Sequence, residues 1–216
     1  MFRWLVLAIA AVALAIAGWY FYNEHAAREA ARLAEVRHAA SIQFVTPPIE
    51  ESTARMTRAV EMLDDQGRIA DDEAFRRIDD DIARIDDSLI ALRSHGTQHE
   101  PAHVAFALKY LTDVQELERR LAAHLRAKLA AGAANEAAKT AQADAAKVPL
   151  AERVPYSDIA FARAEQAEES RLATARTDQQ LKIAIAALID TASNAPPDIP
   201  RTQIALPPAL RAARTP

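Results

Sequence analysis

The sequence lacks cysteine and is poor in glycine and aromatic residues, and each shortage excludes a class of function. With no cysteine among 216 residues, the chain forms no disulfide, holds no thiolate-ligated zinc or iron–sulfur site and uses no thiol nucleophile. Four glycines are too few for phosphate-binding loops and tight hairpins. Charge is nearly balanced, with 26 Lys and Arg against 30 Asp and Glu, so the chain has no cationic surplus of the kind that binds nucleic acid.

Alanine is the residue present in excess, at 51 of the 216 positions. Hydrophobic residues make up 50% of the chain, and alanine supplies almost half of that share. Alanine is the strongest helix former, but its side chain buries far less apolar area than a leucine or isoleucine. The composition therefore predicts an all-α protein with long, thin packing seams rather than a broad core.

The segment from Trp4 to Tyr22 contains nineteen uncharged residues. A helix of that length measures about 28 Å, close to the roughly 30 Å hydrocarbon thickness of a bilayer. Aromatic residues begin the segment at Trp4 and end it at Trp19–Tyr22, as they do at the two membrane interfaces. The segment predicts a single transmembrane helix that anchors the chain, with the lipid bilayer as its partner.

A cleaved signal peptide is the alternative for this segment. Ala15-Ile16-Ala17 before Gly18 has the small-x-small form of a cleavage site. Cleavage there would leave a mature chain that begins with a glycine and four exposed aromatic residues. Only two residues precede Arg3, and such a short amino end is typical of an uncleaved anchor whose remaining chain is translocated. We expect a single-pass protein of a bacterial inner membrane with most of its chain in the periplasm; the alternative is a secreted or periplasmic form cleaved near Ala17.

The rest of the chain divides at prolines and low-complexity stretches. Helix formers after the anchor predict a stalk that Pro47 and Pro48 end, because each proline disfavours a helical residue before it. The Ala-rich stretch 130–147 resembles a semi-rigid helical spacer, and six prolines after residue 195 predict a polyproline-like tail. The predicted organisation is an anchor (1–22), a stalk (23–46), a helical hairpin or bundle core (47–131), a spacer and turn (132–155), a C-terminal helix (156–194) and an extended tail (195–216).

Large apolar residues between positions 75 and 92 are spaced 3, 4, 3, 4 and 3 apart, a heptad pattern sustained for almost three repeats. A further helix, predicted to begin at Pro101 and to end near Leu129, carries leucines and valines at helical spacing. The short link between the two helices suits antiparallel neighbours with coiled-coil-like seams. We expect this seam to pack against a second copy of the chain or another envelope protein. The seam residues are Phe75, Ile78, Ile82, Ile85, Leu89, Leu92, Leu108, Leu111, Leu121 and Leu125.

His95, His99 and His103 recur every fourth residue, and imidazoles at that spacing share a metal ion when they lie on one helix face. Gly96 and Pro101 interrupt the spacing, so a polar link between helices explains the same residues. These histidines are therefore only weak metal candidates, and we expect no resident metal or cofactor.

The segment from Asp64 to Glu73, with Gly67 as its central glycine, resembles the calcium loop of the EF-hand family. It departs from that pattern at the first ligand position, which is Met62, and at the fifth, which is Gln66. A helix–turn–helix connection explains the same residues.

No arrangement in the sequence predicts catalysis. The helix that carries the heptad pattern between positions 75 and 92 also carries aspartates, which alternate with arginines and are typical of a solvated face. No serine lies in a nucleophile-elbow context. We therefore expect a non-catalytic, membrane-anchored scaffold or interaction protein outside the cytoplasm. The alternative is an extracytoplasmic helical module that senses a small molecule or a metal.

Overall fold

The computed structural model describes residues 2–61, 72–149, 153–202, 204, 206 and 207, and only the backbone of residues 2–17, 61 and 72. Within these ranges the chain forms four α-helices and one short 3₁₀ helix, with no β-strand. The predicted all-α class is confirmed. Residues 62–71, which include most of the calcium-loop resemblance, lie outside the described residues. The helices are α1 (Phe2–Glu61), α3 (Asp72–His95), η1 (Gly96–Gln98), α4 (Pro101–Lys147) and α5 (Val154–Ser193).

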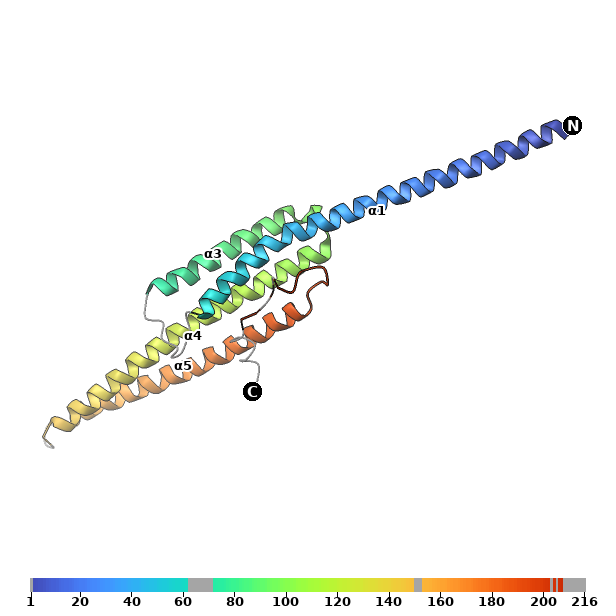
Figure 1. Cartoon of the computed structure of the whole chain (residues 1–216). Helices are drawn as coiled ribbons and strands as arrows, with labels where there is room; N and C mark the ends of the chain where they lie inside the picture. Colours follow the sequence, from blue (N-terminus) through green and yellow to red (C-terminus); the bar gives the residue numbers. More distant parts are fainter. Residues whose placement is uncertain (1, 62–71, 150–152, 203, 205, 208–216) are drawn as a thin grey trace.

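Helix α4 is the centre of the molecule and contacts α1, α3 and α5. Figure 1 shows α1, α3, α4 and α5 side by side in a bundle, with α3 and α4 antiparallel and α5 antiparallel to α4. The amino-terminal part of α1 projects from one end of this bundle, and the linked ends of α4 and α5 project from the other. We name the second projection, residues 131–147 with 154–171, the α4–α5 arm.

Helix α1 does not end at the two prolines, which corrects the predicted break between residues 41 and 48. Both prolines lie inside the helix, and Figure 1 shows α1 changing direction where it enters the bundle. A proline inside a helix costs about 3 kcal/mol or more. Val45, Ile49 and Met56 are completely buried, and each such side chain contributes about 1.5–3 kcal/mol. This burial opposes the cost of the two prolines, about 6 kcal/mol or more, and the predicted stalk (23–46) continues into the first part of the predicted core (47–131) as one helix.

Helix α4 continues to Lys147, which corrects the helix end predicted near Leu129. The Ala-rich stretch is therefore part of a helix about 70 Å long rather than a spacer between elements. Two charge pairs at i, i+3 support it, Lys139–Glu136 at 2.8 Å and Lys147–Asp144 at 3.0 Å, and Ala145 is buried in the arm. Strong helix propensity and the facing α5 explain the continuation.

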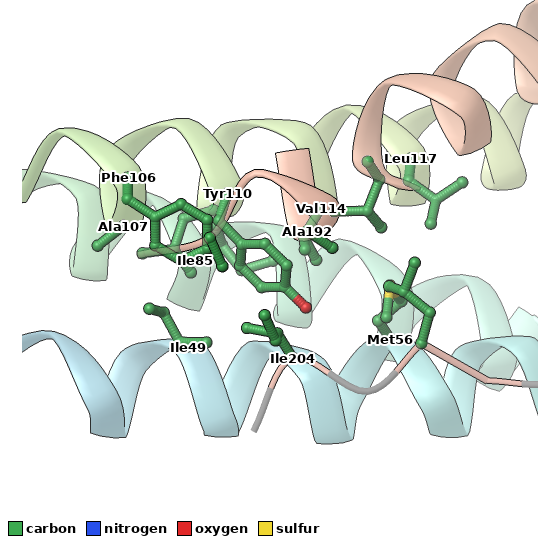
Figure 2. Close-up of a cluster of buried hydrophobic side chains, with 14 of the residues drawn as sticks. Ile49, Met56, Ile85, Phe106, Ala107, Tyr110, Val114, Leu117, Ala192 and Ile204 are labelled. Carbon is green, nitrogen blue, oxygen red and sulfur yellow. The ribbon is translucent and has the colours of Figure 1, made fainter. Parts of the chain in front are cut away.

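The main core joins all four α-helices and the described part of the tail. Figure 2 shows Ile49 and Met56 of α1 facing Ile85 of α3 and several side chains of α4, with Tyr110 between them. The Tyr110 hydroxyl, which is completely buried, lies 2.8 Å from the hydroxyl of Thr53 on α1 and so satisfies both groups.

The described part of the tail folds back onto this core, which corrects the expectation of a free extended segment. Four of its apolar side chains are buried as members of the main core; they are Ala195, Ile199, Ile204 and Leu206.

Among the described residues, no helix has a stretch both long enough and apolar enough to cross a membrane. The side chains of residues 4–17, which form most of the predicted anchor, lie outside the described residues.

Candidate functional site

The predicted interaction seam lies inside the chain's own bundle. Seven of its ten residues are no more than 3% exposed, and the other three are partly buried against the core. A partner would therefore have to contact another surface. The seven are Ile78, Ile85, Leu89, Leu92, Leu111, Leu121 and Leu125, and the three are Phe75, Ile82 and Leu108.

The structure separates the three histidines that the sequence singled out. His95 is exposed at the end of α3. His99 stacks its ring on Phe44 of α1, with ring centroids 4.1 Å apart. Only His103 is buried, with 3% of its side chain exposed, on the first turn of α4.

His103 instead meets residues from two distant segments. Its Nδ1 atom lies 3.0 Å from Glu100 Oε2, and Nδ1 of His38 on α1 lies 3.1 Å from the same oxygen. On the other side of both rings, Asp198 Oδ2 of the tail lies 3.6 Å from Nε2 of His38 and 3.9 Å from Nε2 of His103. We name these four residues the polar junction.

Local structure holds the polar junction in place. The backbone N–H of Glu100 donates to Ser41 Oγ at 2.8 Å, and Ser41 in turn donates to the Arg37 carbonyl at 2.7 Å. This bond fixes the start of α4 against α1. Pro101 follows in the first turn of α4, where the N–H that proline lacks would have no partner inside the helix. Ile199, completely buried, fixes the chain next to Asp198.

Sequence reasoning missed His38, Glu100 and Asp198 as site residues. His38 belonged to the predicted stalk and Asp198 to the predicted tail, and neither segment was expected to contact α4. The pair His38 and Glu100 is 62 positions apart, so no local spacing connects them. A signal for Glu100 existed in the sequence, because it lies three residues before His103 at helical spacing.

A second polar region lies between α1 and α3. Arginines and aspartates surround a hollow of about 500 Å³, lined by Arg55, Arg58, Ala59, Arg77, Asp80, Asp81 and Arg84. The aspartates of α3 are thus matched by arginines of both helices. Burial raises the pKa of Asp81, while the nearby Arg55, Arg58 and Arg84 oppose that rise.

Glu118 of α4 is completely buried in the core beside this region. Neither of its carboxylate oxygens has a hydrogen-bond partner among the described residues. Burial, with a further contribution from the charge of Asp81, raises its pKa to about 8, and Arg55 opposes the rise. This carboxyl is therefore protonated in the folded protein at neutral pH.

Comparison with known proteins finds no matching family model, no similar curated protein and no similar solved structure.

Proposed function

We propose that the chain is a membrane-anchored scaffold that holds a helical bundle outside the cytoplasm, packs against another copy or another protein, and catalyses no reaction. The observation that carries this proposal is the set of four consecutive aromatic residues Trp19–Tyr22. Their exposed fractions are between 66% and 73%, on a helix that projects away from the bundle (Figure 1).

The arrangement of these aromatic residues favours a membrane interface over a protein partner. Successive residues of an α-helix are rotated by about 100°, so four consecutive side chains point to all sides of α1. A protein partner covers one side of a helix, whereas the boundary between water and lipid surrounds it, and aromatic residues are enriched at that boundary. The uncharged residues before Trp19 supply the segment that lipid would enclose.

The surface for partners, in this proposal, is the outward face of α5. Val154, Phe161 and Leu172 are 68%, 67% and 47% exposed. Their spacings of seven and eleven residues correspond to two and three helical turns, which places them on one face. Since the predicted seam is buried within the bundle, this exposed apolar stripe offers a surface for helix packing.

Membrane extraction tests the anchor. The full chain is expected to stay in the membrane pellet after alkaline carbonate washing. The double variant Ala10→Arg/Ala13→Arg is expected to shift to the soluble fraction, because each arginine at the centre of a membrane helix costs about 2.5–3.5 kcal/mol. The matched variant Ala27→Arg/Ala30→Arg carries the same charges on exposed positions and is expected to remain in the pellet. Recovery of the unmodified full chain in the soluble fraction would refute the anchor.

The orientation is tested in the same preparation. Because the chain has no cysteine, Ala162→Cys introduces a unique thiol on an exposed position of α5. A membrane-impermeant maleimide is expected to label this thiol in cells whose inner membrane is intact. Labelling that requires membrane disruption would place the bundle in the cytoplasm.

A further inference from the structure

We propose that the polar junction binds one zinc ion through Nδ1 of His38, Nδ1 of His103 and Oε2 of Glu100, with Asp198 as the carboxylate that orients the two imidazoles. The three ligand atoms lie within 4.8 Å of one another. This inference does not depend on the membrane anchor or on the partner surface.

The distances from Glu100 to the two histidines are close to those of a tetrahedral zinc centre. Zinc binds histidine nitrogen and carboxylate oxygen at about 2.0–2.2 Å, so two of its ligand atoms are about 3.3–3.5 Å apart. In the structure, Glu100 Oε2 lies 3.1 Å from His38 Nδ1 and 3.0 Å from His103 Nδ1. Shifts of a few tenths of an ångström would bring these two distances to the zinc values, and the two imidazole nitrogens, which lie within 4.8 Å of each other, would have to come to a similar separation. Two imidazoles and one carboxylate suit zinc rather than calcium or magnesium, which prefer oxygen ligands only.

The second observation is the buried nitrogen of His103. Its Nδ1 atom makes no hydrogen bond to any described residue, although a carboxylate oxygen lies only 3.0 Å away. A buried polar atom without a hydrogen bond costs about 1–3 kcal/mol. A metal ion at the centre of the junction would coordinate this atom and remove that penalty.

The position of Asp198 supports the same assignment. Histidines that bind a metal usually donate their other ring N–H to a carboxylate, which fixes the tautomer. Asp198 Oδ2 lies on the Nε2 side of both rings, at 3.6 and 3.9 Å. These distances are longer than a hydrogen bond, so Asp198 would have to move closer on metal binding to accept the Nε2–H of a histidine. A proton held at Nε2 in that way would leave the lone pair of Nδ1 free for the metal.

The proposed ion would link three parts of the chain that are far apart in sequence. His38 belongs to α1, Glu100 and His103 to the start of α4, and Asp198 to the tail. Because zinc ligation would hold these segments together, the stability of the whole bundle would respond to zinc. His38 and Glu100 keep 39% and 37% of their side chains exposed, so water can reach the site and would supply the remaining ligand.

Titration of the full chain with Zn²⁺ tests the proposal, using detergent-solubilised protein purified without a polyhistidine tag. Calorimetry is expected to show one site per chain, and circular dichroism is expected to show a rise of several degrees in melting temperature. His38→Ala is expected to weaken binding at least 100-fold and to abolish the rise. Asp198→Asn is expected to weaken binding about 10- to 100-fold.

The controls separate ligation from folding and from adventitious binding. His25→Ala and His95→Ala remove exposed histidines outside the junction and are expected to leave the affinity unchanged. His103→Asn keeps a polar group in the buried position, and Co²⁺ absorption bands typical of tetrahedral ligation are expected in the unmodified chain but not in this variant. Absence of stoichiometric zinc binding, or equal loss of affinity in His38→Ala and His95→Ala, would overturn the proposal.

Discussion

At the scale of single residues, Glu118 is expected to make the stability of the bundle depend on pH. It is the one completely buried acidic side chain among the described residues, and its carboxyl has no hydrogen-bond partner there. Its pKa is about 8 in the folded chain, against 4.5 for an ordinary glutamate. The folded state therefore binds a proton between these pH values that the unfolded state releases.

The expected consequence is a free energy of unfolding that falls as pH rises from 4.5 to 8. Below pH 4.5 the carboxyl is protonated in both the folded and the unfolded state, so it no longer makes the free energy of unfolding depend on pH. Each pKa unit corresponds to about 1.4 kcal/mol, so the penalty at pH 8 is of the order of several kcal/mol. Glu118→Gln is expected to match the unmodified chain at pH 4.5 and to exceed its stability at pH 8, as measured by urea unfolding at both values. Glu165→Gln, on an exposed position of α5, is the control, and parallel pH profiles for Glu118→Gln and the unmodified chain would contradict the prediction.

The polar junction shows what residue-level reading of a sequence leaves out. The sequence identified His103 but paired it with His95 and His99, because spacing along one helix was the only geometry available. The observed neighbours His38 and Asp198 depend on α1 passing the start of α4 and on the tail returning to the core. Both depend on tertiary packing, and neither has a local pattern.

At the scale of elements, helix type followed from composition and periodicity, and helix boundaries did not. The heptad spacing from Phe75 to Leu92 lies on α3, and its alternation with charged residues matches the buried and exposed faces of that helix. Pro47 and Pro48 led to a wrong prediction of where α1 ends. The burial of α1 side chains that keeps the helix intact depends on contacts with other helices, which the local sequence does not show. The Ala-rich end of α4 misled in the same way, since α5 provides its facing surface.

The turn between α3 and α4 provides an element-scale prediction. A β-carbon added at Gly96 would lie 2.7 Å from Val104 Cγ1, whereas one added at Gly132 inside α4 would meet nothing within 4 Å. Val104 is β-branched and has little freedom to move aside. Gly96→Ala is therefore expected to destabilise the fold by about 1–3 kcal/mol, and Gly132→Ala to stabilise it by about 0.5–1 kcal/mol.

Thermal or urea unfolding measures both effects, and a rescue variant isolates the cause. Val104→Ala is expected to destabilise the Gly96→Ala variant less than it destabilises the unmodified chain. In the Gly96→Ala variant, the substitution also removes the methyl group that clashes with the new β-carbon. Equal effects of Gly96→Ala and Gly132→Ala would show that the close approach to Val104 does not matter.

At the scale of the whole molecule, the bundle buries its own seams and leaves the apolar stripe Val154, Phe161 and Leu172 exposed on α5. If the scaffold proposal is right, the full chain in detergent associates through this stripe. Phe161→Glu/Leu172→Glu is expected to lower the mass measured by sedimentation or to abolish cross-linking to a partner in membranes. Ala162→Glu/Ala173→Glu places the same charges with the same spacing on exposed positions one residue further along α5 and is expected to have little effect. A full chain that is monomeric and has no cross-linked partner would contradict the association.

Because α1 is one continuous helix, the number of residues in it sets both the distance and the rotation between its two ends. Each residue inserted between positions 23 and 37 would lengthen this rod by 1.5 Å and turn the bundle by about 100° relative to Phe2. Seven inserted residues would restore almost the original azimuth while adding about 10 Å of reach. The direction in which α5 presents its apolar stripe is therefore encoded in the number of residues that precede it.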